Sequence, residues 1–337
     1  MAVFILKRLA FLVPQLAIVI VGTFLLLRLL PADPAAKVAG LVSTPEAIAQ
    51  AKRVLGIDKS VSAQLWTYVK GLVHGDLGRS WATGEPVRNE IQAKFPVTLQ
   101  LIVLAFVLAL SIAIPVGCVA AERPGGRVEK FVLGYALFAG AQPDFWWGLF
   151  FVFLFAAKLS LFPVPTGIVD ATLNLPPPTT HFILIDAPLH GYWDVFSNAS
   201  WHYCLPVCTL AFVLTGPLIK MTRNSVLHVV GSDYILYARA AGFPARTVRW
   251  TMLRNSLAPV VTLTGILFGF MLGGAVLIEY VFTLDGLGRY ALNATLNFDY
   301  PAVQGAVIVM TAFALFVYLV MDICHALLDP RVRYGER

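Results

Sequence analysis

The chain has 337 residues, of which 58% are apolar and only 13% are charged, and its formal net charge is +6 at neutral pH. This composition excludes an ordinary soluble enzyme and indicates an integral membrane protein. The positive charge requires no nucleic-acid partner, because an excess of Lys and Arg in cytoplasmic loops accounts for it. The cysteines at 118, 204, 208 and 324 fall in or beside apolar segments without metal-site spacing, so packing is the better interpretation.

The hydropathy pattern predicts an all-α polytopic membrane protein with six transmembrane helices. The first apolar segment is too long for a signal peptide and lacks a clear small-residue cleavage site, so we expect a retained anchor. The third contains Gln142-Pro143-Asp144, and we expect it to be tilted or broken there. The six segments are residues 9–30, 97–121, 131–157, 201–223, 260–282 and 302–328.

The distribution of Lys and Arg predicts the orientation. Residues 220–254 carry 6 of them and residues 122–130 carry 3, whereas the loops 158–201 and 283–301 carry 1 each. Positive charge concentrates in cytoplasmic loops. We therefore expect both termini and the loop before the fifth span to be cytoplasmic.

Residues 31–96 carry the signals of short soluble helices. Thr44-Pro45-Glu46 predicts a capped helix start and Gly56 its end, and residues 63–73 form a second amphipathic run. The glycines of residues 75–84 precede no Lys-Ser or Lys-Thr pair, so they predict a turn and not a phosphate loop.

The most distinctive stretch is Ser232–Pro259. Ser232 or Asp233 can cap a helix of about 9 residues, roughly 13 Å long and too short to cross a bilayer. Gly242 can end this helix, and Pro244 suits the first turn of the next one. Two interpretations remain open, a plug for a socket on another protein or an ordinary surface helix.

This stretch resembles the coupling loop of ABC-importer permeases of the dipeptide, oligopeptide and nickel branch. The resemblance is carried by Asp233-Tyr234, Ala238-Arg239-Ala240, Gly242 and Leu253-Arg254-Asn255 with Pro259. Leu236 stands where the general signature has an acid, and Asp144 where the family usually offers serine. Further matching motifs are Gly75-Asp76-Leu77-Gly78-Arg79-Ser80, Glu279 with Gly286-Leu287-Gly288, Asp299-Tyr300-Pro301 with Gln304-Gly305, and Asp329-Pro330-Arg331-Val332-Arg333.

The resemblance implies a type I ABC-importer permease fold. Its expected parts are an anchor (1–30), an extracytoplasmic helical segment (31–96), a permease domain (97–328) and a cytoplasmic tail (329–337). The permease domain contains an extracytoplasmic insertion (158–201) and the coupling loop (232–259). The residues expected to couple to the ATPase are Tyr237, Ala238, Arg239, Ala240, Ala241, Gly242 and Phe243.

The implied function is a non-catalytic subunit of an ATP-driven importer in the bacterial inner membrane, forming the pathway for peptides delivered by an extracytoplasmic binding protein. The implied partners are a second related permease in a heterodimer, two cytoplasmic ATPase subunits or domains, the binding protein and the bilayer. ATP and magnesium would be bound by the partners. The resemblance leaves open whether the substrate is a dipeptide, an oligopeptide, glutathione or a nickel chelate.

The alternatives are a proton- or sodium-coupled secondary transporter and an intramembrane enzyme. The chain contains no Gly-Lys pair, so an ATP site of the G-x-x-x-x-G-K-[ST] type is excluded. No internal repeat supports a secondary transporter, and no nucleophile–base pair within the spans supports an enzyme.

Candidate pathway or gate residues are few. Asp144 is either a helix-capping acid or an anion in the pathway. Glu279 lies at the expected level of Arg28, which suggests a charge pair, and Asp322 with His325 forms either an interfacial pair or a proton relay. Gly265, Gly269 and Gly273 recur at four-residue spacing, so another helix can approach closely, either inside this subunit or at an interface or pathway.

Overall fold

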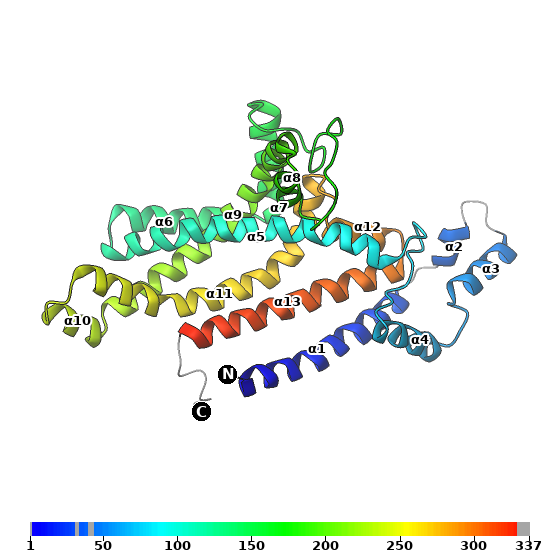
Figure 1. Cartoon of the computed structure of the whole chain (residues 1–337), viewed down its shortest axis with the longest axis horizontal. Coiled ribbons are helices and arrows are strands. Elements are labelled where there is room, and N and C mark those ends of the chain that lie inside the picture. The colour runs from blue at the N-terminus through cyan, green and yellow to red at the C-terminus, as the bar shows by residue number, and fades with distance from the viewer. Residues whose placement is uncertain (1, 31–33, 40–43, 329–337) are drawn as a thin grey trace.

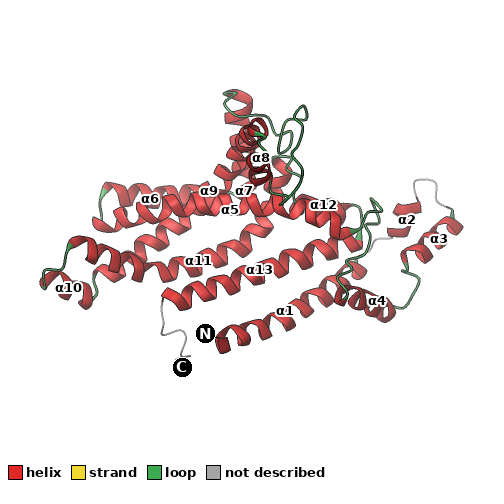
Figure 2. Cartoon of the chain, viewed as in Figure 1, coloured by secondary structure: helices red, strands yellow, loops and turns green. Residues whose placement is uncertain are grey.

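The computed structural model describes residues 2–30, 34–39 and 44–328 of the chain. Within these ranges the chain forms helices and loops, and the only extended pairing is an isolated bridge between Arg79 and Pro86. Figure 2 shows that helix dominates and that the longest loop lies beside the short helix α8 (Ile183–Leu189). The all-α prediction is confirmed. The C-terminal motif at 329–333 lies outside the described residues.

In the described part of the chain, five helices are long and apolar enough to cross a membrane, and a bent pair of helices makes a sixth span if its halves are counted together. The bent pair is α6 (Arg127–Ala139) followed by α7 (Asp144–Phe151) and the π-helix η1 (Val152–Lys158), with an angle of 96° between its halves. The break expected at Gln142-Pro143 is therefore confirmed. The five single helices are α1 (Ala2–Leu29), α5 (Val87–Glu122), α9 (Trp193–Val230), α11 (Ala245–Val281) and α13 (Tyr300–Leu328).

The helices extend well beyond the apolar segments that predicted them. α5, α9 and α11 have 36, 38 and 37 residues. Hydropathy marks the part of a helix that suits the bilayer, whereas the helix itself ends where its backbone hydrogen bonds end. The loop predicted for residues 158–201 is wrong in its second half. α8 and the first two turns of α9 lie there instead.

The segment after α1 folds into α2 (Pro34–Ala39), α3 (Pro45–Leu55) and α4 (Val61–Val73). As predicted, the Thr44 side chain accepts a hydrogen bond from the N–H of Ala47, and Gly56 ends α3 with φ of 67°. A positive φ costs glycine little, since it has no Cβ. These short helices lie at the opposite end of the long helices from α10 (Asp233–Ala240), as Figure 1 shows.

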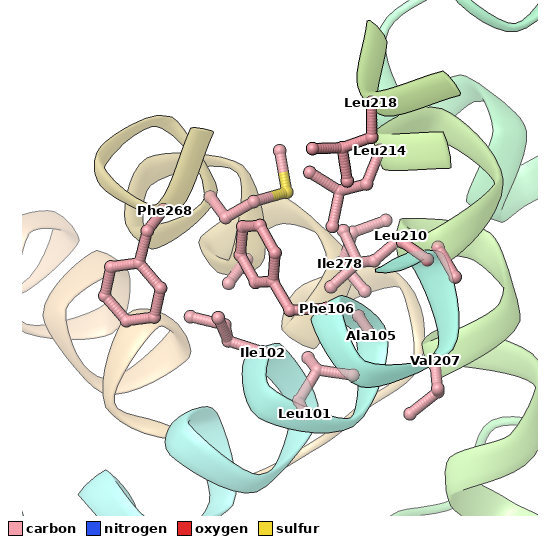
Figure 3. Packing of buried hydrophobic residues seen from close by; sticks show 14 of the residues in the cluster. Leu101, Ile102, Ala105, Phe106, Val207, Leu210, Leu214, Leu218, Phe268 and Ile278 are labelled. Atoms are coloured by element: carbon pink, nitrogen blue, oxygen red, sulfur yellow. The ribbon is translucent and has the colours of Figure 1, made fainter. Parts of the chain in front are cut away.

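The core is formed mainly by α5, α9 and α11, and α5 with α9 is the most extensive helix pair. Two glycines allow the helices to approach closely. A Cβ on Gly117 would lie 2.7 Å from Cβ of Thr222 on α9, and one on Gly216 would lie 3.1 Å from Cα of Ala136 on α6. The side chains that interdigitate here include Leu101, Ile102, Ala105 and Phe106 of α5, Val207, Leu210, Leu214 and Leu218 of α9, and Phe268 and Ile278 of α11 (Figure 3).

α1 and α13 pack on the outside of this core. Only 6% of the residues in the apolar window of each helix are buried, against 61% for α9. The apolar faces of α1 and α13 are therefore available to lipid or to another membrane protein.

Candidate functional site

The connection between α9 and α11 holds the short helix α10 in a fixed position. Ser232 is the N-cap residue, although its hydroxyl donates to the carbonyl of Val229 and does not cap the helix. Gly242, with φ of 73°, ends the turn after α10, where the N–H of Phe243 donates to the carbonyl of Ala238 at 3.1 Å. Pro244 then precedes α11. The predicted short helix and its glycine stop are confirmed.

The inner face of α10 packs on the start of α11. Ile235 is almost fully buried and forms a cluster with Val229 and Val248, against which Ala238 and Met252 pack. The side chain of Asn255 donates to the hydroxyl of Tyr234 at 3.2 Å. The two halves of the sequence motif thus contact each other, which makes α10 a rigid extension of α11.

The outer face of α10 is apolar and exposed. The side chains of Leu236, Tyr237 and Phe243 are 52%, 72% and 53% exposed, and Ala240 and Ala241 are exposed beside them. We call these five residues the α10 patch. Ala238 does not share this face, because it is half-buried and packs on the cluster of Val229, Ile235 and Val248. Exposed aromatic and apolar side chains on a fixed helix outside the membrane are typical of a protein-docking surface.

An ion pair joins α6 to α9 at the end of the long helices nearest α10. Arg223 of α9 forms an ion pair with the buried carboxylate of Glu129 on α6, which also accepts the N–H of Gly125. This pair fixes the loop 122–130 to the helix that leads into α10. Contacts therefore connect α10 to α9 and α11, and α9 to α6.

Glu279 is fully buried at the far end of α11 and is held by a dense set of hydrogen bonds. Its carboxylate accepts from the hydroxyl of Thr98 on α5 at 2.5 Å and from the N–H of Arg289 at 2.8 Å. The Thr98 hydroxyl in turn accepts from the N–H of Leu287 at 2.8 Å. The carboxylate thus caps the N-terminus of α12 (Leu287–Leu296). This end of a helix is the positive end of its dipole and stabilises an acidic group.

The glycines of the Gly286-Leu287-Gly288 motif are explained by this carboxylate. A Cβ on Gly286 would overlap the carboxyl group of Glu279, and one on Gly288 would lie 2.8 Å from Cα of Val276. The expected charge pair between Glu279 and Arg28 is wrong. Arg28 instead donates to the side chain of Gln64 at 2.9 Å and to the carbonyl of Phe24 at 3.0 Å.

Asp144 begins α7 and lies against α11. Its carboxylate is half-buried, and a Cβ on Gly274 would lie 2.6 Å from Oδ2 of Asp144. Gly265 and Gly269 face Met321 and Tyr318 of α13, so close packing inside the subunit accounts for both, whereas a Cβ on Gly273 would meet nothing within 4 Å.

Asp322 forms an ion pair with Arg8 of α1 at 3.1 Å, which the sequence did not indicate. A hollow between α1, α11 and α13 is lined by both residues and by His325.

Asp299 is also buried, and the sequence indicated it only as part of a matching motif and not as a structural acid. Its carboxylate accepts from the hydroxyl of Ser80 at 2.5 Å and from the N–H of Ala82 at 3.1 Å, and it caps α13 through the N–H of Ala302 at 3.3 Å. Gly78 lies against Pro301. The two motifs at 75–80 and 299–305 therefore contact each other. The acid directly before Tyr300-Pro301 was the sequence signal that could have predicted a helix-capping carboxylate here.

The described structure defines a polytopic helical membrane protein with a short helix that exposes an apolar face at one end and a cluster of short helices at the other. Residues 113–334 match the model of the binding-protein-dependent transport system inner membrane component, and residues 1–102 match the model of the N-terminal part of such membrane components. The chain belongs to this family and is a permease subunit of an ATP-driven importer. The alternative of a secondary transporter is wrong.

Three relatives cover nearly the same length. The dipeptide transport system permease protein DppB of Escherichia coli (strain K12) is 36% identical over 99% of both chains. The di/tripeptide transport system permease protein DppB of Pseudomonas aeruginosa (strain UCBPP-PA14) is 36% identical over 98% of both. The probable D,D-dipeptide transport system permease protein DdpB of Escherichia coli (strain K12) is 38% identical over 94% of this chain and 93% of its own.

Proposed function

We propose that this chain forms one half of the pathway for short peptides, in a heterodimer with a second related permease. The names of the three relatives, which include dipeptide and di/tripeptide permeases, support a peptide substrate. The chain contributes no catalysis in this proposal. ATP and magnesium are bound by two ATPase subunits or domains, and an extracytoplasmic binding protein delivers the peptide.

The α10 patch is the observation that carries the proposal. Its exposed side chains lie on a helix whose inner face is locked to α11, so a partner that binds the patch moves α11 and α9 as well. Tyr237, Ala240, Ala241 and Phe243 make the contact with the ATPase, Arg239 and Gly242 shape its edge, and Ala238 supports it from within.

The same proposal assigns the parts of the chain. Residues 1–30 are the anchor, 31–96 the extracytoplasmic segment, 97–328 the permease domain and 329–337 a cytoplasmic tail. Within the permease domain, the insertion 158–201 lies outside the membrane and the loop 232–259 lies in the cytoplasm. Both termini are cytoplasmic. The count of 6 Lys and Arg in residues 220–254 supports this orientation. Asp144, which lies against Gly274, is the pathway acid, whereas Glu279, Gly265 and Gly269 position the helices around it.

The test is transport by the whole complex in proteoliposomes. We expect uptake of a labelled dipeptide that requires ATP and the binding protein, and no ATP hydrolysis by this chain purified alone. Uptake driven by a proton or sodium gradient without ATP would contradict the mechanism. ATP-dependent uptake of a nickel chelate or glutathione, with no peptide uptake, would support the importer mechanism but contradict the proposed peptide substrate.

A further inference from the structure

A hollow of about 600 Å³ opens where α1 ends, between α1, α3, α4, the turn around residue 80 and the start of α13. The transport mechanism proposed above does not use it. Its lining is rich in polar side chains: Arg28, Lys59 and Arg79 are positively charged, Asp76 is negatively charged, and Gln64, Tyr68 and Gln304 are neutral.

The hollow contains a half-buried permanent cation. The guanidinium of Arg28 lies 3.4 Å from the centroid of the Phe24 ring and donates only to Gln64 and to the carbonyl of Phe24. Among the described residues, no carboxylate lies within ion-pair distance of it. A cation removed from water in this way favours an anion as its partner.

Two neutral donors line the same hollow. The hydroxyl of Tyr68 and the amide nitrogen of Gln304 are buried and have no hydrogen-bond partner among the described residues. Burial raises the pKa of Tyr68 above its ordinary value, while the charge of Arg28 opposes the shift, so the hydroxyl keeps its proton at neutral pH. Arg28, Tyr68 and Gln304 come from α1, α4 and α13, and a ligand that satisfies all three must accept hydrogen bonds.

The hollow lies at the membrane surface. Arg28 is in the last turn of the apolar span Arg8–Leu29. Gln64 contacts Arg28, and the ring of Tyr68 stacks on that of Phe24 with centroids 5.7 Å apart, so α4 runs back along α1 towards the bilayer.

Apolar side chains are exposed around the opening. Val38 and Val54 line the hollow and are 48% and 78% exposed. Trp66 and Val73, on the face of α4 turned away from the hollow, are 72% and 80% exposed. Amphipathic helices with exposed tryptophan and valine are typical of the bilayer interface.

We propose that this hollow binds the phosphate headgroup of an anionic phospholipid, with Arg28 as the charged ligand and Tyr68 and Gln304 as neutral donors. Lys59 and Arg79 add positive charge to the lining. Inorganic phosphate offers the same oxygen chemistry. The exposed apolar side chains favour the lipid, because they provide a surface for its acyl chains. In the topology proposed above, the site faces the outer leaflet.

The experiment is a titration of the detergent-purified transporter complex with short-chain phosphatidylglycerol, and in parallel with inorganic phosphate, followed by native mass spectrometry. We expect one phosphatidylglycerol at this site and about tenfold weaker binding in the Arg28→Gln variant, since a charge-assisted contact is lost. Arg53→Gln is the matched control, because it removes the same charge from the exposed side of α3. Its affinity is expected to equal that of the wild type.

Tyr68→Phe tests the site without altering charge or ring stacking, and we expect severalfold weaker binding. This variant keeps the test decisive if Arg28→Gln fails to assemble. Equal phosphatidylglycerol affinity in the wild type and in Tyr68→Phe and Arg28→Gln would overturn the proposal. Inorganic phosphate that binds as tightly as the lipid would overturn the lipid as the ligand. Unchanged lipid binding with weakened binding-protein docking would also overturn it, and would indicate a protein contact.

Discussion

The hydroxyl of Thr98 donates a hydrogen bond to the buried carboxylate of Glu279, 181 residues further along the chain. The same hydroxyl accepts the N–H of Leu287, so one threonine joins α5 to the end of α11 and the start of α12. We expect Glu279→Gln to lower the free energy of unfolding by about 1–3 kcal/mol, because the amide replaces one of the two accepting oxygens with an NH₂ group and leaves a buried donor unpaired. Thr98→Ser, which keeps the hydroxyl, is expected to cost less than Thr98→Val. Unfolding of the purified chain in detergent measures both, and equal stability of the valine and serine variants would contradict this role.

Two glycines provide a direct comparison of close packing with open space. A Cβ on Gly288 would lie 2.8 Å from the backbone of Val276, whereas a Cβ on Gly273 would meet nothing within 4 Å. We expect Gly288→Ala to lower the melting temperature clearly, since a backbone contact cannot yield cheaply. Gly273→Ala is expected to be neutral or slightly stabilising, because alanine favours a helix by about 1 kcal/mol over glycine. A lower melting temperature for Gly273→Ala than for Gly288→Ala would refute the packing.

Ser80 and Asp299 are expected to be energetically coupled. Their hydrogen bond is buried and links the turn after α4 to the start of α13. A double-mutant cycle with Ser80→Ala and Asp299→Asn should give a coupling of about 1–3 kcal/mol. The exposed pair of Lys94 and Asp285, 2.7 Å apart, is the control and should give less than about 1 kcal/mol. Comparable coupling in the two cycles would mean that burial does not strengthen the Ser80 contact.

Much of this structure could be predicted from local patterns in the sequence. Thr44, Pro45 and Gly56 define α3 because capping and left-handed turns depend on a few adjacent residues. The break before Asp144 could be predicted because proline interrupts a helix and because the apolar segment 131–157 is longer than a bilayer crossing requires.

Contacts between distant segments could not be predicted in the same way. Glu279 was expected to pair with Arg28 only because both lie at the same expected level in the membrane. Its partners are instead Thr98 and the backbone of α12. Ala238 was grouped with Ala240 and Ala241 as a coupling residue, yet it packs on the cluster of Val229, Ile235 and Val248, which the sequence of one helix does not reveal. Motifs therefore identified the important segments but not the contacts between them.

The orientation in the membrane can be tested by cysteine labelling on a background without the four native cysteines. Gln50 of α3 and Ala245, the first residue of α11, are exposed. Figure 1 shows α3 and α10, which directly precedes α11, at opposite ends of the molecule. We expect Gln50→Cys to react with an impermeant maleimide outside the inner membrane, and Ala245→Cys to react only after permeabilisation, because positive loops stay inside. The reverse pattern would mean that the topology is inverted.

The most direct test of the account is co-purification of the ATPase with the Ala240→Arg variant. Ala240 is exposed on the α10 patch, so an arginine there leaves the fold intact and obstructs only a partner that approaches closely. Ala240→Ser is the mild control, and Ala63→Arg places the same side chain on an exposed position of α4. The account predicts normal insertion of Ala240→Arg, at least tenfold less bound ATPase and no peptide uptake, with both controls close to wild type. Normal ATPase binding and uptake by Ala240→Arg would show that α10 is an ordinary surface helix and would contradict the account.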